Sequence, residues 1–229
     1  LLSPIRVFAA MAAISLLLNF NRFHMYELGV SSLYLVRWVL YSALYFISLQ
    51  KMITSRQWLT WTYWSGVGVA ILGLVQYVLY NDLRNLFYLG WDPHYYRVFS
   101  TFFDPNYLSL YLVLTMFLGM YVLSGKMRWL YVVGQLVTFA AFLLTYSRSG
   151  YVAFLVGLLV YALYMRKVKI ILIGVTVFFA ILLVLPKPDG EGVKLLRTAS
   201  TFARVGNWQR GFTLIKEAPI VGFGFNTLR

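Results

Sequence analysis

Seven apolar runs, separated by short polar segments, dominate the hydrophobic pattern of the chain. They cover roughly residues 5–20, 31–49, 59–80, 107–124, 129–146, 150–165 and 168–185. A helix needs about 20 apolar residues to cross a bilayer. All but the first, second and sixth runs are long enough to cross easily, and those three need polar flanks or tilt. The pattern therefore predicts an all-α, polytopic transmembrane helix bundle over residues 1–185.

Composition supports a membrane protein and narrows its partners. Hydrophobic residues make up 61% of the chain and charged residues 12%, whereas soluble domains carry roughly 25% charged residues. The net charge of +13 is better explained by cytoplasmic loops that face anionic lipid than by nucleic acid, because no basic run has base-stacking spacing. No cysteine is present, and no carboxylate pair or histidine cluster suggests a metal or another cofactor.

The basic residues predict an orientation in the membrane. Three loops that follow even-numbered runs contain basic residues and no acid: Lys51, Arg56, Lys126, Arg128, Arg166, Lys167 and Lys169. Every acid lies on the opposite side: Glu27, Asp82, Asp92, Asp104, Asp189, Glu191 and Glu217. Because loops rich in Lys and Arg stay in the cytoplasm, we expect the first set inside. The short hinge 145–150, and Arg148 with it, then faces outward.

Two outer segments are longer than turns. The first, 81–106, ends in an Asp-Pro-Asn helix-start signal, with Asp104 or Asn106 as the cap. The second, 186–229, is predicted to begin a large extracytoplasmic loop. Within it, 207–216 has the pattern of a short amphipathic helix at the outer interface, with three apolar residues on one face: Trp208, Phe212 and Ile215. The chain starts at Leu1 and stops at Arg229 within a motif, so we expect a longer protein.

Arg37 is the only charged residue near the middle of an apolar run, because Arg6 and Lys169 lie at the ends of theirs. Such a residue either faces a bundle interior or wet cavity with a functional role, or snorkels to the interface or to carbonyls. No Asp or Glu lies in any run, which argues against a proton-coupled pump. No internal repeat of the alternating-access type is visible.

Three outward segments each carry an arginine: Arg97, Arg148 and Arg204. A bundle can bring them together at one membrane face. Guanidinium groups are permanently charged forks that suit phosphate. At the outer lipid boundary this arrangement favours binding of a lipid-linked diphosphate.

The same residues stand in three motifs whose order and spacing resemble the bacterial O-antigen ligase and polymerase family. The motifs are Arg97-x4-Phe102-x2-Pro105-Asn106, Thr145-x-Ser147-Arg148-x-Gly150 and Arg204-x3-Trp208-x10-Pro219-x2-Gly222-x-Gly224. The resemblance implies a metal-independent glycosyltransferase of the bacterial cytoplasmic (inner) membrane. Such enzymes move a glycan from an undecaprenyl-diphosphate carrier to an acceptor hydroxyl on a glycan, lipid or protein, in the synthesis of lipopolysaccharide and other cell-envelope polysaccharides.

The resemblance also implies residue roles. Arg148 and Arg204 match the family's outward arginines and are assigned to catalysis, where they neutralise the diphosphate leaving group. Apart from those two roles, we assign substrate binding to Arg97, Asn106 and Ser147 of the motifs, to Arg210 near the amphipathic helix, and to Arg37 as a charge within an apolar run. The family takes the acceptor proton with a histidine of the large outer loop, and no histidine follows His94 here. We expect that base beyond Arg229.

A different class of protein fits some of the same features. The chain could be a non-enzymatic protein that binds or transports lipid-linked glycans, such as a flippase or channel subunit. Its arginines would then serve lipid head groups.

Overall fold

The structure is a computed structural model, and it describes residues 2–49, 54–84, 94–122, 128–166, 168–186, 193–194, 199–220 and 222–227. Within these ranges the chain is helical, with one isolated antiparallel bridge between Asp82 and Tyr95 and no strand. The predicted all-α class is confirmed for this part of the chain. The elements are α1 (Leu2–Leu18), η1 (Phe20–Arg22), α2 (Met25–Leu49), α3 (Ser55–Leu79), η3 (Ser100–Phe102), α4 (Pro105–Val122), α5 (Arg128–Leu143), α6 (Arg148–Tyr164), α7 (Val168–Val184) and α8 (Ala199–Glu217).

The prediction of seven spans is not confirmed. Two of the described helices, α3 and α4, are both long enough and apolar enough to cross a membrane. Shorter apolar stretches of 10–17 residues lie in α1, α5, α6 and α7. At 1.5 Å per residue such stretches reach at most about 25 Å, short of a hydrocarbon core of about 30 Å.

Local signals explain where the two long helices begin. Thr54 and Gln57 form a capping box at the start of α3, so this helix starts earlier than the apolar run beginning at residue 59. The Asp104 carboxylate accepts hydrogen bonds from the backbone N–H groups of Asn106 at 2.6 Å and Tyr107 at 3.3 Å. Of the two predicted caps of α4, the structure thus selects Asp104.

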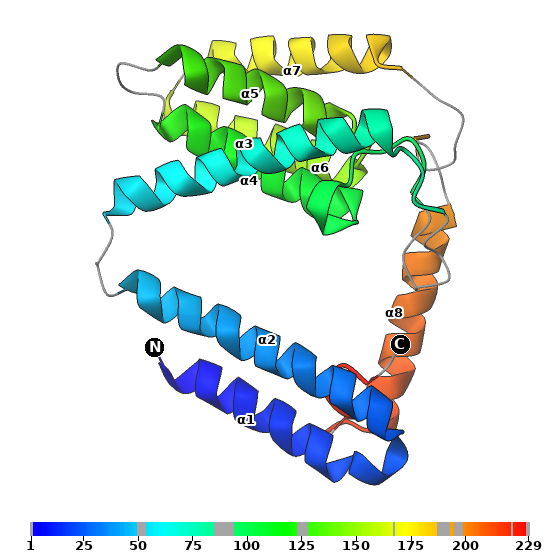
Figure 1. Ribbon diagram of the computed structural model, residues 1–229. Helices are drawn as coiled ribbons and strands as arrows, with labels where there is room; N and C mark the ends of the chain where they lie inside the picture. The colour runs from blue at the N-terminus through cyan, green and yellow to red at the C-terminus, as the bar shows by residue number, and fades with distance from the viewer. Residues whose placement is uncertain are drawn as a thin grey trace. The chain divides into compact units, whose positions relative to one another are not determined.

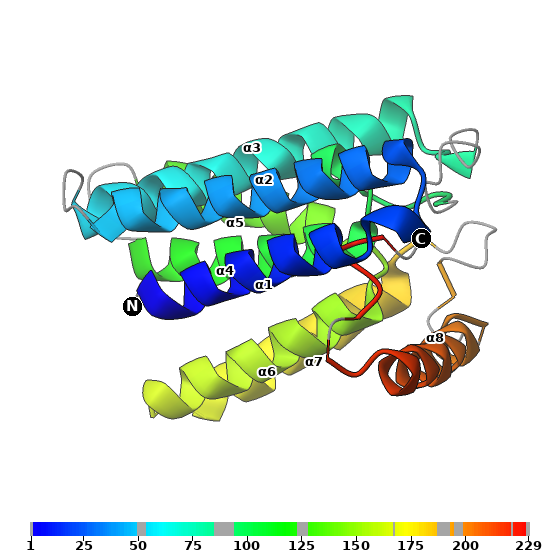
Figure 2. The same ribbon diagram turned by 90° about the horizontal axis from the view of Figure 1, so that it is seen from below.

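The chain divides into two compact units. The central unit, Thr54–Arg197, contains α3 to α7 (Figure 1), and α6 packs against α7 (Figure 2). Its core includes Phe142 of α5, Phe154 of α6 and Phe178 of α7, whose ring centroids lie 5.4 to 6.4 Å apart. These aromatic contacts pack the three helices against one another.

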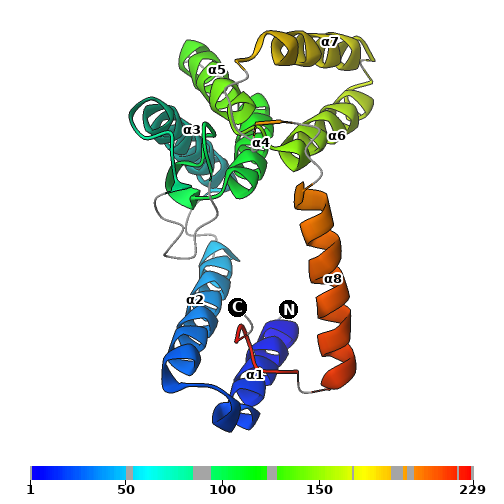
Figure 3. The same cartoon turned by 90° about the vertical axis from the view of Figure 1, so that its right-hand side faces the viewer.

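The terminal unit consists of Leu1–Ile53 and Thr198–Arg229. It contains the α1–α2 hairpin, α8 and the segment 222–227 (Figure 3). α8 begins earlier than the amphipathic helix expected at 207–216, and it ends before Pro219 as the sequence predicts. Phe8 of α1 and Trp38 of α2 pack with centroids 4.5 Å apart, which joins the two helices of the hairpin.

Candidate functional site

One end of the central unit collects the segments that carry two of the three sequence motifs. The backbone N–H of Val98 donates to the carbonyl of Leu144 at 2.9 Å, which attaches the segment 94–104 to the α5–α6 turn (144–147). The phenol of Tyr146 donates to the carbonyl of Pro186, at the end of α7. The end of α5, the start of α6 and the end of α7 therefore meet here.

Arg97 is the main link between these segments. Its side chain is buried, with 3% exposed. Nε donates to the carbonyl of Thr145 at 2.8 Å, and Nη2 makes a longer contact of 3.5 Å to the carbonyl of Tyr146. The guanidinium thus supplies donors to carbonyls that follow the end of α5 and lack helical partners.

The N-termini of α4 and α6 lie side by side. Ser147 caps α6, because its Oγ accepts from the N–H of Gly150 at 3.3 Å, and the same hydroxyl donates to Oδ1 of Asn106 at 3.0 Å. Gly150 permits this approach: a Cβ added there would lie 2.6 Å from Cβ of Ser109. The two helices can adopt this spacing only with glycine at that position.

The α6 side of this junction has positive electrostatic character. Each helix N-terminus carries the equivalent of roughly half a positive charge. Arg148 occupies the first turn of α6 and is partly exposed, while Ser147 is buried and Ser149 exposed. The N-terminus of α6, the Arg148 guanidinium and the Ser149 hydroxyl therefore lie close together, whereas the Asp104 carboxylate caps the N-terminus of α4 and offsets its positive charge. Backbone N–H groups and a fixed positive fork are the donors that phosphate oxygens accept.

Backbone strain concentrates at the same end. Among the described residues of the central unit, five non-glycine residues have positive φ, and four belong to the segments just described: Tyr96 at 50°, Ser100 at 49°, Phe103 at 54° and Tyr146 at 48°. Such conformations cost of order 1 kcal/mol or more each, and in proteins they cluster at functional sites. Their position thus agrees with a site at this end.

Sequence reasoning missed Gln76 of α3, which organises the segment 94–104. Its Oε1 accepts from the N–H groups of Phe99 at 3.0 Å and Ser100 at 3.3 Å. The Ser100 hydroxyl in turn donates to the carbonyl of Val69 at 2.8 Å. A glutamine near the end of an apolar run was the only available signal.

The mixed charges of the outer segment 81–106 are partly explained by local pairing. Arg84 and Asp82 form an ion pair at 2.6 Å, and the hydrogen bond from Arg84 holds the pKa of the Asp82 carboxyl below its usual value. The Arg84 guanidinium also stacks 4.1 Å from the ring centroid of Tyr95. His94 is buried, and its carbonyl accepts from the N–H of Leu83 at 2.8 Å. Asp92 lies outside the described residues.

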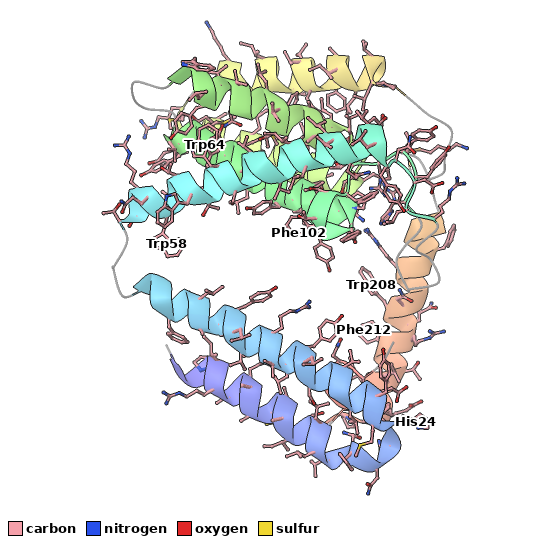
Figure 4. The ribbon with its side chains drawn as sticks, viewed as in Figure 1. His24, Trp58, Trp64, Phe102, Trp208 and Phe212 are labelled. Carbon is pink, nitrogen blue, oxygen red and sulfur yellow. The ribbon has the colours of Figure 1, made fainter. Side chains whose placement is uncertain are left out.

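Arg204 and Arg210 belong to the terminal unit. Both are exposed on α8. Trp208 and Phe212 project from the same side of this helix (Figure 4), with 70% and 65% of each side chain exposed. Ile215 is also exposed, so the predicted apolar face of α8 is present. The convergence of Arg204 with Arg148 stays a prediction.

Arg37 lies on an exposed part of α2. Its guanidinium stacks 4.5 Å from the ring centroid of Tyr34, one turn earlier on the same helix. This is a cation–π contact. Its predicted role in substrate binding stays a prediction, as does that of Arg210.

Comparison with known proteins agrees with the motifs. Residues 133–229 match the family model described as "O-Antigen ligase". No curated protein and no solved structure matches the chain. The matched range contains two of the three predicted motifs, including Arg148 and Arg204, and it indicates a bacterial membrane protein of polysaccharide biosynthesis. Residues 133–229 of this chain are therefore similar to the O-antigen ligase family.

Proposed function

We propose that the protein transfers a glycan from an undecaprenyl-diphosphate carrier to an acceptor hydroxyl on the outer side of the bacterial cytoplasmic membrane. One observation carries the proposal. The N-termini of α4 and α6 lie together, joined by Asn106 and Ser147, and Arg148 stands on the first turn of α6. The family match over 133–229 supports this class of reaction.

The diphosphate is the part of the donor that this junction suits. During transfer the acceptor oxygen bonds to the anomeric carbon, while the bond from that carbon to the diphosphate oxygen breaks. The electron pair of the broken bond stays on the diphosphate, so negative charge grows there. Fixed positive groups at that position stabilise the transition state more than the ground state.

The residues of the junction then have distinct tasks. Arg148 contacts the diphosphate and neutralises the leaving oxygen. The buried Ser147 and its partner Asn106 hold the two helix ends at a fixed spacing. Arg97 acts as a positioning residue, because it donates to carbonyls of the α5–α6 turn immediately before Arg148.

Arg204 is proposed as a second group that neutralises the diphosphate. It lies within the matched family range and is exposed on α8. The proton of the acceptor hydroxyl goes to a base of the large outer loop. The outward orientation follows from the charge bias of the loops.

Removal of the Arg148 charge tests the proposal. In membranes supplied with carrier-linked glycan and acceptor, Arg148→Ala is expected to lower transfer about 10²–10³-fold, as for loss of one group that stabilises a developing negative charge. Arg148→Lys keeps the charge and loses the fork, so it should restore only part of the rate. Arg56→Ala is the matched control, since Arg56 is an exposed arginine near the start of α3.

Two readouts separate transfer from mere binding. The Arg148→Ala membranes should accumulate carrier-linked units and contain less finished polymer, while the amount of inserted protein stays equal to that of Arg56→Ala. Normal polymer in Arg148→Ala membranes would refute the catalytic role and leave the non-enzymatic alternative.

A further inference from the structure

In the terminal unit, two buried polar side chains of the α1–α2 hairpin hold the segment 222–227 by hydrogen bonds. Nδ2 of Asn19 donates to the carbonyl of Gly222 at 3.3 Å, and Oγ of Ser31 donates to the carbonyl of Asn226 at 2.9 Å. Asn19 is 3% exposed and Ser31 is fully buried. Neither lies in the range that matches the family. Because buried polar groups need hydrogen-bond partners, these two side chains favour one docked position of the segment 222–227 on the hairpin.

Ring contacts and backbone conformation fit the same docking. The ring of Phe225 meets Phe8 edge-on, with centroids 6.1 Å apart, and the Arg22 guanidinium lies 5.9 Å from the ring centroid of Phe223. Gly224 has φ +105°, a conformation that L residues rarely adopt. Gly224 of the third sequence motif therefore allows the backbone turn with which the segment 222–227 packs on the α1–α2 hairpin (Figure 3).

Hydrogen bonds continue from this docked segment into α8. The N–H of Gly222 donates to the carbonyl of Ala218 at 3.2 Å, and the N–H of Ala218 donates to the carbonyl of Leu214 at 3.1 Å. The docked segment is thus linked to the end of α8 by consecutive backbone bonds. Many side chains of α8 are exposed, Trp208 and Phe212 among them, so the helix has little packing of its own to hold it.

We infer that Asn19 and Ser31 are positioning residues for glycan transfer: by docking the segment 222–227 they hold α8, and with it Arg204, in place. This inference rests on the proposed function. It assigns a task to the first two helices, which the family match does not cover.

The docking is tested by thiol labelling, because the natural chain has no cysteine. Thr227 is 6% exposed in the docked segment, so the thiol introduced by Thr227→Cys should react slowly in membranes. Adding Asn19→Ala or Ser31→Ala should raise the reaction rate about tenfold, as expected for loss of one hydrogen bond to the docked segment; Asn19→Ala also removes a bond within the hairpin, from Nδ2 to the carbonyl of Ser15 at 2.8 Å. Ser32→Ala is the matched control, since that hydroxyl donates only within α2, to the carbonyl of Leu28.

Transfer activity tests the functional half. In the cysteine-free background, Asn19→Ala and Ser31→Ala should each lower the rate of glycan transfer about tenfold, Ser31→Thr should restore it, and Ser32→Ala should leave it unchanged. Exposure of the thiol without loss of transfer overturns the inference, and so does loss of transfer with the thiol still protected.

The Arg148→Ala experiment keeps the two ideas separate. If Arg148→Ala transfers normally, the proposed function fails. If Arg148→Ala is inactive but Asn19→Ala and Ser31→Ala are fully active, only the positioning role fails.

Discussion

The close approach of α4 and α6 predicts that one methyl group at Gly150 disables the site. A Cβ at this position would lie 2.6 Å from Cβ of Ser109, whereas ordinary carbon contacts are about 3.5–4.0 Å. Ser109 is fully buried and its hydroxyl donates to the carbonyl of Asn106 at 2.7 Å, so it has no room to turn away. The N-terminus of α6 must therefore move by about 1 Å.

The expected effects on stability and activity differ in size. Overpacking costs about 1–3 kcal/mol, and alanine gains about 1 kcal/mol over glycine in a helix. Gly150→Ala should therefore lower the free energy of unfolding by only about 1 kcal/mol. A displacement of about 1 Å can cost roughly 10²-fold in rate, so glycan transfer should fall far more than stability.

Matched variants make this result specific. Gly68→Ala in α3 is the control, because a Cβ there meets nothing within 4 Å. Ser109→Gly combined with Gly150→Ala removes the clash and should recover transfer. Thermal unfolding in detergent and transfer from carrier-linked glycan measure the two effects. Equal transfer by Gly150→Ala and Gly68→Ala would show that the spacing of these helices does not matter to the reaction.

Two further substitutions probe the same end of the central unit. Arg97→Met removes the donors to the carbonyls of Thr145 and Tyr146, and it should destabilise the protein by about 1–3 kcal/mol; an unchanged unfolding temperature in detergent would contradict the buried role of Arg97. The exposed Ser149 can report the orientation in the membrane, because the chain has no cysteine. The thiol of a Ser149→Cys variant should react with a membrane-impermeant reagent from outside intact cells. Reaction only after the membrane is opened would reverse the proposed topology.

Local signals in the sequence determined the helices of this protein. Long apolar runs specify α3 and α4, and Asp104 followed by Pro105 specifies where α4 begins, because capping and proline geometry act over a few residues. The arginine motifs could also be recognised from the sequence alone. The number of membrane crossings could not, since apolar length sets helix length only approximately.

Tertiary structure decided which polar residues meet. Asn106 and Ser147 are 41 residues apart in the chain, and only the contact of Gly150 with α4 brings their side chains to 3.0 Å. Asn19 and Ser31 gave no sequence signal, yet both bind the backbone of a segment about 200 residues away. Contacts of this kind depend on the relative placement of helices, and a local pattern of apolar and polar residues contains no information about it.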